Sequence, residues 1–173
     1  MGSSTRTESW IDMKAILVII KQLLRSKAFW KIVTEIALAL LAMMREQKSA
    51  PTDAERAKAG AALEAKLEEA RLKRMELELE LKKREFELQK TVFELERARM
   101  EAAHPNSKRN AASARKAVTA AEKENVASSE RVDEVAHAVA VLKKVEEACD
   151  ARDEKALERL TSALVLVPRE GAS

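Results

Sequence analysis

The chain has 173 residues, of which 46% are apolar and 35% are charged, while only 3% are aromatic and tyrosine is absent. Strands favour aromatic and β-branched residues, and turns between strands favour Gly and Pro, yet the sequence contains only three Gly and three Pro. The apolar content is too high for a chain that is disordered throughout. This composition argues against a β-rich fold and predicts an all-α protein.

Charge is distributed unevenly along the chain. The whole sequence has 32 basic and 29 acidic residues, a net charge of +3, but the first 50 residues contain eight basic and four acidic side chains. The remaining 123 residues contain 24 basic and 25 acidic ones. The chain therefore has a basic, apolar beginning and a nearly neutral, highly charged remainder, and a net charge this small does not indicate a nucleic-acid partner.

Residues 9–47, called the N-terminal segment below, follow a flexible tail at residues 1–8. Ser9 and Asp12 have the spacing of a helix-capping box, and the bases that follow occupy one narrow stripe of a helix whose other faces are mostly apolar. This pattern predicts an amphipathic helix that docks on a membrane or on a partner. The expected docking residues are Trp10, Ile16, Ile19, Ile20, Leu23, Leu24, Phe29 and Trp30, with the bases Lys14, Lys21 and Arg25.

A second apolar run, from Ala28 to Met44, bears on whether this segment spans a membrane. Its longest uncharged stretch, Ile36–Met44, has nine residues, whereas a span needs about 20 predominantly apolar ones. Glu35 would also be costly inside a bilayer. Docking on a membrane or partial insertion therefore stays open, beside a single span and beside burial against protein, which would be a partner or the chain's own bundle. The expected localisation is a membrane surface, or otherwise the cytoplasm.

A linker at residues 48–52 separates the N-terminal segment from a long helix. Pro51 disfavours helical geometry at the residue before it, and Thr52 with Glu55 forms a second capping box. No proline follows until Pro105, so we expect one helix over residues 53–103. A helix of this length is typical of coiled coils.

Two apolar rows run along this long helix. The first row steps by four and three residues, with Arg74, Arg84 and Thr91 as polar interruptions, and is the expected seam with another helix: Leu63, Leu67, Leu77, Leu81, Leu88 and Leu95. The second row recurs every seven residues on nearly the opposite side: Leu72, Leu79, Phe86, Phe93 and Met100. Apolar rows on both sides predict neighbours on both sides, either other helices of the chain or a second protomer.

Pro105 ends the long helix in a turn, and a second helix is expected over residues 107–150. A connection this short favours antiparallel neighbours, and the second helix has its own apolar row, which includes Val132, Val135, Val139 and Leu142. Asn125 interrupts that row and is interpreted as a residue that sets the register.

A short helix over residues 153–167 and a tail at 168–173 complete the expected body of the protein, residues 53–167. The predicted fold is all-α: a long antiparallel, coiled-coil-like helical hairpin with an apolar N-terminal helical segment and a short C-terminal helix. The single Cys149 makes the fold independent of disulfides.

No arrangement of residues in the sequence indicates catalysis. It contains two histidines and one cysteine, and it lacks metal-ligand spacings, a Gly-rich phosphate loop and a nucleophile elbow. We therefore expect no enzyme activity, cofactor, metal or small-molecule substrate, and the basic clusters lack aromatic residues on which nucleic-acid bases could stack. The sequence predicts a non-enzymatic helical assembly protein that forms homo-oligomers. The alternative is a soluble subunit of a larger complex whose N-terminal helix is buried against a partner protein.

Overall fold

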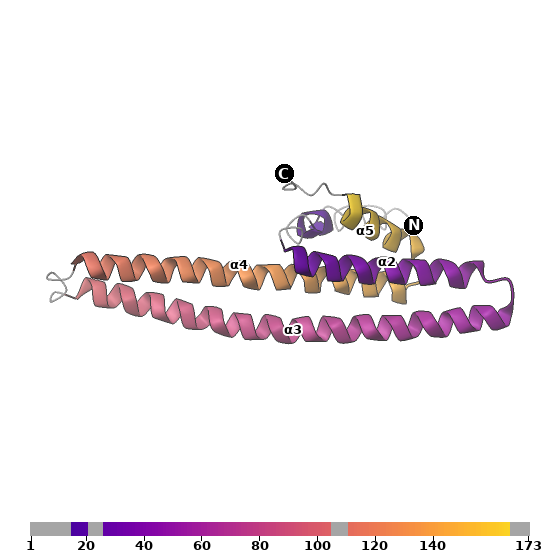
Figure 1. The fold of residues 1–173 in the computed structure, drawn as a ribbon, viewed down its shortest axis with the longest axis horizontal. Coiled ribbons are helices and arrows are strands. Elements are labelled where there is room, and N and C mark those ends of the chain that lie inside the picture. The colour runs from indigo at the N-terminus through magenta and orange to yellow at the C-terminus, as the bar shows by residue number, and fades with distance from the viewer. Residues whose placement is uncertain (1–14, 21–25, 105–110, 167–173) are drawn as a thin grey trace, which may run out of the picture. The chain divides into compact units, whose positions relative to one another are not determined.

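The computed structural model describes residues 15–20, 26–104 and 111–166, and these residues are almost entirely helical (Figure 1). Residues 15–20 are helical, and the helices after them are α2 (Lys27–Ser49), α3 (Asp53–Ala103), α4 (Ala111–Asp150) and α5 (Glu154–Leu166). Within the described residues there is no β-strand. The prediction of an all-α fold is confirmed.

The long helices α3 and α4 pack against each other as the predicted antiparallel hairpin (Figure 1). The bounds of α3 agree with the predicted range 53–103, and α4 ends at the predicted Asp150. The predicted start of the second helix at residue 107 and both predicted tails lie outside the described residues. Because Pro and capping signals are local, they located the ends of the long helices well.

The chain divides into two compact units, which are described separately. The first unit comprises residues 1–77 and 137–173, and the second unit comprises Glu78–Ala136. The first unit therefore contains α2, α5, the beginning of α3 and the end of α4. The second unit contains the remaining parts of α3 and α4.

In the first unit, each helix buries an apolar row with helical spacing. Burial of a large aliphatic side chain contributes about 1.5–3 kcal/mol, so these rows are the main source of the unit's stability. The members with the least exposed surface are Val33, Ala37 and Leu40 on α2, Leu63 on α3, Leu142 and Val145 on α4, and Leu157 and Leu164 on α5.

α2 packs against α5, so the described part of the N-terminal segment contacts the other end of its own chain. The Trp30 indole nitrogen donates a hydrogen bond of 3.0 Å to the backbone carbonyl of Leu164. Farther along α2, Arg45 forms an ion pair of 2.7 Å with Glu158, and Lys48 forms one of 2.8 Å with Glu154. The hydrogen bond from Lys48 is the largest cause that lowers the pKa of Glu154, and a hydrogen bond from Arg45 to Glu154 contributes.

Side-chain capping bonds stabilise the N-terminal ends of α3 and α5. Thr52 and Glu55 form the predicted capping box: the Glu55 amide donates to Thr52 Oγ1 at 3.2 Å, and the Thr52 amide donates to Glu55 Oε2 at 3.3 Å. Asp153 caps α5 by accepting a bond of 2.9 Å from the Ala156 amide. Ser26 precedes α2 but makes no side-chain capping bond.

The turn between α4 and α5 depends on Arg152, whose φ of 54° lies in the left-handed region. This conformation lets the Asp153 amide donate to the Ala148 carbonyl at 2.9 Å, which closes the end of α4. The Arg152 guanidinium pairs with Glu64 on α3 and donates to Gln47 on α2 at 3.1 Å. These contacts offset the cost of the left-handed backbone and connect the turn to two other helices.

Gly60 lies where α3 approaches α2 closely. A Cβ atom at this position would lie 2.7 Å from the amide nitrogen of Gln47, a separation that requires the Gln47 side chain to move. The absence of a Cβ at Gly60 therefore leaves room for the end of the Gln47 side chain of α2.

In the second unit, the seam between α3 and α4 is shallower and contains polar contacts. Leu81, Leu88 and Leu95 are only partly buried. Thr91 Oγ1 accepts a hydrogen bond of 3.3 Å from the side-chain nitrogen Nδ2 of Asn125. These two polar interruptions of the apolar rows therefore face each other. The same pairing of polar interruptions occurs in the first unit, where Arg74 donates to the buried carboxylate of Glu146 at 2.8 Å.

A core truncation tests the burial pattern of the first unit. Leu142→Ala should lower the free energy of unfolding by about 2–5 kcal/mol, because Leu142 is fully buried and its loss leaves a cavity. Leu38→Ala is the matched control on α2, where the leucine is 44% exposed, and it should change stability by less than about 1 kcal/mol. Urea unfolding followed by circular dichroism measures both; equal losses would contradict the described core.

Candidate interaction surface

The second apolar row of α3 lies on the surface of the chain. The side chains of Leu72, Leu79, Phe86, Phe93 and Met100, together called the outer stripe, are between 58% and 68% exposed. Residues seven apart lie on nearly the same side of a helix, so the five side chains form one row along α3. The printed contacts between α3 and α4, Arg74 with Glu146 and Thr91 with Asn125, lie on its other side. The seam residues Leu63, Leu67, Leu77, Leu81, Leu88 and Leu95 are buried or half-buried.

The outer stripe exposes more apolar surface than scattered surface residues do. Five large side chains at this exposure present on the order of 500 Å², which is comparable to the largest apolar patch on a typical monomeric protein. Patches of this size and continuity mark sites of interaction. The expectation of neighbours on both sides of α3 is thus met on one side by α4, while the described helices leave the outer stripe uncovered.

Charged residues border the outer stripe on both sides. On a helix, the positions three before and four after a given residue lie beside it on one flank. For the outer stripe these positions hold Glu69 and Glu76, followed by Lys83, Lys90, Arg97 and His104. The position directly before each stripe residue lies on the opposite flank, and these positions hold, in chain order, Arg71, Glu78, Glu85, Val92 and Arg99. Around Leu79 and Phe86 the stripe therefore has bases on one flank, Lys83 and Lys90, and acids on the other, Glu78 and Glu85. The positions of these charges relative to the second apolar row are a signal that the sequence contains and that the predictions made from it did not use.

The predicted apolar row of α4 faces inward. Val135, Val139 and Leu142 are buried and Val132 is partly buried, so these residues serve the contact with α3. Val126, by contrast, is 57% exposed on α4.

The predicted docking residues of the N-terminal segment lie in different environments. Ile16 and Ile20 are buried, whereas Ile19, Phe29 and Trp30 are partly buried. Trp10, Lys14, Lys21, Leu23, Leu24 and Arg25 lie outside the described residues. In the same short helix, Leu17 and Val18 are exposed, so the apolar surface available near residues 15–20 differs from the surface that the sequence suggested.

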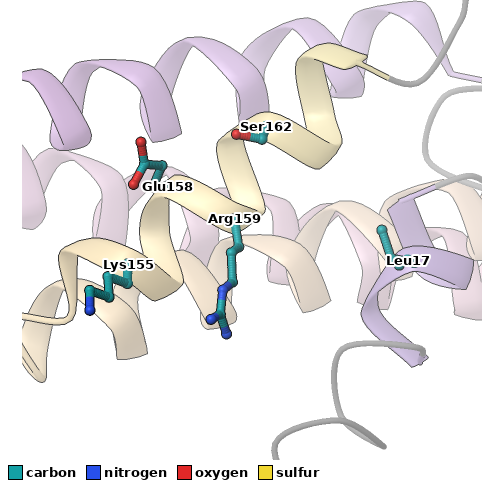
Figure 2. Close-up of a pocket in the computed structure, with 5 residues that line it drawn as sticks. All are labelled: Leu17, Lys155, Glu158, Arg159 and Ser162. Carbon is teal, nitrogen blue, oxygen red and sulfur yellow. The ribbon is translucent and has the colours of Figure 1, made fainter.

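A shallow, open hollow of about 570 Å³ lies between α5 and Leu17. Its lining residues are Leu17, Lys155, Glu158, Arg159 and Ser162 (Figure 2). Lys155 and Arg159 are one helical turn apart and project from the same side of α5 (Figure 2). Both side chains belong to exposed residues, so the hollow carries positive charge but does not enclose a ligand.

The described residues contain no cluster of His, Cys, Asp or Glu side chains that could hold a metal ion. Cys149 is buried on α4, and this burial raises the pKa of its thiol from 9.0 to about 11. A thiol in this state is protonated at neutral pH and reacts slowly.

Among residues 15–20, 26–104 and 111–166, no helix combines the length and the apolar character needed to cross a bilayer. Comparison with known proteins supplies no further assignment: no family model, no curated protein and no solved structure matches the chain.

The state of Cys149 can be measured directly. At pH 8 the native chain should react with a thiol reagent at least roughly a hundredfold more slowly than the urea-unfolded chain, because a pKa raised from 9.0 to about 11 lowers the thiolate fraction by that factor. The free energy of unfolding should be insensitive to this thiol below pH 9 and should fall as the pH rises toward 11, because the unfolded state then releases the proton first. Equal reaction rates in the two states would contradict the burial of Cys149.

Proposed function

We propose that this chain is a non-enzymatic helical assembly protein that self-associates through the outer stripe of α3. The observation that supports this proposal is the row of five exposed apolar side chains at seven-residue intervals on one helix. Such a period is the one that allows two helices to remain in contact over several turns. A surface that served only solubility would carry charged residues at these positions instead.

The size of the outer stripe sets an expectation for the strength of association. Two stripes that cover each other remove on the order of 1,000 Å² from water, which is close to the lower limit for a specific interface. The gross apolar gain of roughly 25 cal/mol per Å² is largely offset by the loss of translational and rotational freedom. We therefore expect reversible, concentration-dependent association.

Substitutions in the outer stripe test this function. In the double variant Phe86→Ser/Phe93→Ser the mass measured by light scattering should stay at that of the monomer, while the mass of the unchanged chain rises with concentration, because the variant loses the two aromatic side chains of the stripe. Val126→Ser is the matched control, because it removes an exposed apolar side chain from α4. A monomeric unchanged chain at all concentrations would overturn the proposal.

Membrane docking by the N-terminal segment is a second candidate function. It is supported by the exposed side chains of Leu17 and Val18, which lie in sequence between Lys14 and Lys21. Anionic headgroups would attract the bases at about 1 kcal/mol each, while the apolar side chains enter the acyl boundary. The buried Ile16 and Ile20 support the alternative, in which this segment packs on protein.

Flotation with anionic vesicles separates these two possibilities. If lipid is the partner, the full chain should float, and Lys14→Glu/Lys21→Glu/Arg25→Glu as well as Leu17→Ser/Val18→Ser should remain at the bottom of the gradient. Point substitutions are preferable to removal of residues 1–47, because that deletion would also remove the buried residues of α2. Vesicles of neutral lipid serve as the control, and a full chain that does not float with anionic lipid would exclude membrane docking.

A further inference from the structure

We infer that two copies of the chain associate with their α3 helices parallel and in register. This inference rests on the proposed self-association through the outer stripe and adds the direction of the partner helix. It follows from the charges that flank Leu79, Phe86, Phe93 and Met100 within the second unit.

The charges that flank Leu79 and Phe86 are complementary when two α3 helices are parallel and in register. If the outer stripe occupies the a positions of a heptad pattern, Lys83 and Lys90 occupy e positions and Glu78 and Glu85 occupy g positions. In a parallel pair, each g residue faces the e residue of the next heptad on the other helix. Glu78 of one copy would therefore face Lys83 of the second copy, and Glu85 would face Lys90, with the same two pairs repeated by symmetry.

An antiparallel pair would place like charges together. In that orientation e positions face e positions and g positions face g positions. Lys83, Lys90 and Arg97 would then approach one another's positions in the second copy, and Glu78 would approach Glu85. The exceptions are registers that bring a base to Glu76 or an acid to Arg71 or Arg99. Like charges at these positions oppose association. At the e and g positions, attraction between Glu78 and Lys83 and between Glu85 and Lys90 thus favours the parallel arrangement.

The d positions of this pattern explain why association would be weak and sensitive to salt. They hold Met75, Lys82, Gln89 and Glu96, so the apolar contact consists of a single row instead of the two rows of a conventional coiled coil. A larger share of the specificity then depends on exposed ion pairs, which salt screens.

Disulfide trapping tests the orientation. In a Cys149→Ala background, Leu79→Cys and Met100→Cys should each form a disulfide with the same position of a second copy, because an in-register parallel pair places identical a positions opposite each other. Val126→Cys, exposed on α4, is the control and should give only collisional cross-linking. A thermal midpoint measured by circular dichroism confirms that each variant is folded.

The outcomes separate this inference from the proposed function. If the unchanged chain associates by light scattering but disulfides form only between Leu79→Cys and Met100→Cys in a mixture, the helices are antiparallel and the inference is overturned while self-association stands. If the unchanged chain is monomeric at every concentration, the proposed function fails and this inference fails with it.

Charge reversal provides an independent readout. Lys83→Glu/Lys90→Glu and Glu78→Lys/Glu85→Lys should each raise the dissociation constant of the pair roughly tenfold, because four attractive contacts become repulsive. A mixture of the two variants should recover association close to that of the unchanged chain. Because an antiparallel pair has like charges together before and after either reversal, unchanged dissociation constants would contradict the parallel arrangement.

Discussion

Packing between α3 and α4 occupies one side of each helix, and the remaining organisation of the chain depends on that contact. The leucine row of α3 from Leu63 to Leu95 is buried or half-buried, and the contact pairs the polar interruptions of the seam, Arg74 with Glu146 and Thr91 with Asn125. An unpaired buried carboxylate or amide would be costly, so these pairs restrict the register of the two helices. Since the seam uses only one side of α3, the outer stripe has no counterpart in α4.

The other constraint is the return of α5 onto α2 in the first unit. Trp30, Arg45 and Lys48 all bond to α5, and the α2 residues Val33, Ala37 and Leu40 are fully buried. Much of the apolar character of the N-terminal segment is therefore accounted for by packing within the chain. Among the described residues of this segment, Leu17, Val18 and Leu38 are the exposed large apolar side chains. For this reason we propose self-association through the outer stripe first and membrane docking of the N-terminal segment second.

Local signals made much of the fold predictable from the sequence. Pro51, the Thr52 and Glu55 box and the seven-residue rows identify α3 and its two apolar sides without any knowledge of tertiary contacts. The pairing of α2 with α5 was not predictable in this way, because Trp30 and Leu164 are 134 residues apart and an apolar row does not specify which other row it meets. The left-handed conformation of Arg152 was not predictable either, because the Arg152 side chain contacts Glu64 and Gln47, which are distant in sequence.

The shallow seam of the second unit has a consequence for how the protein unfolds. Val135 and Ser128 are buried there, but the leucines of α3 in this unit retain partial contact with water, so less apolar surface opposes opening than in the first unit. Regions with few buried contacts exchange their amide hydrogens through low-energy fluctuations. Most of the outer stripe belongs to this same unit. Association through the outer stripe would therefore stabilise the second unit, which has the shallower seam. The local order of this unit would then increase with protein concentration.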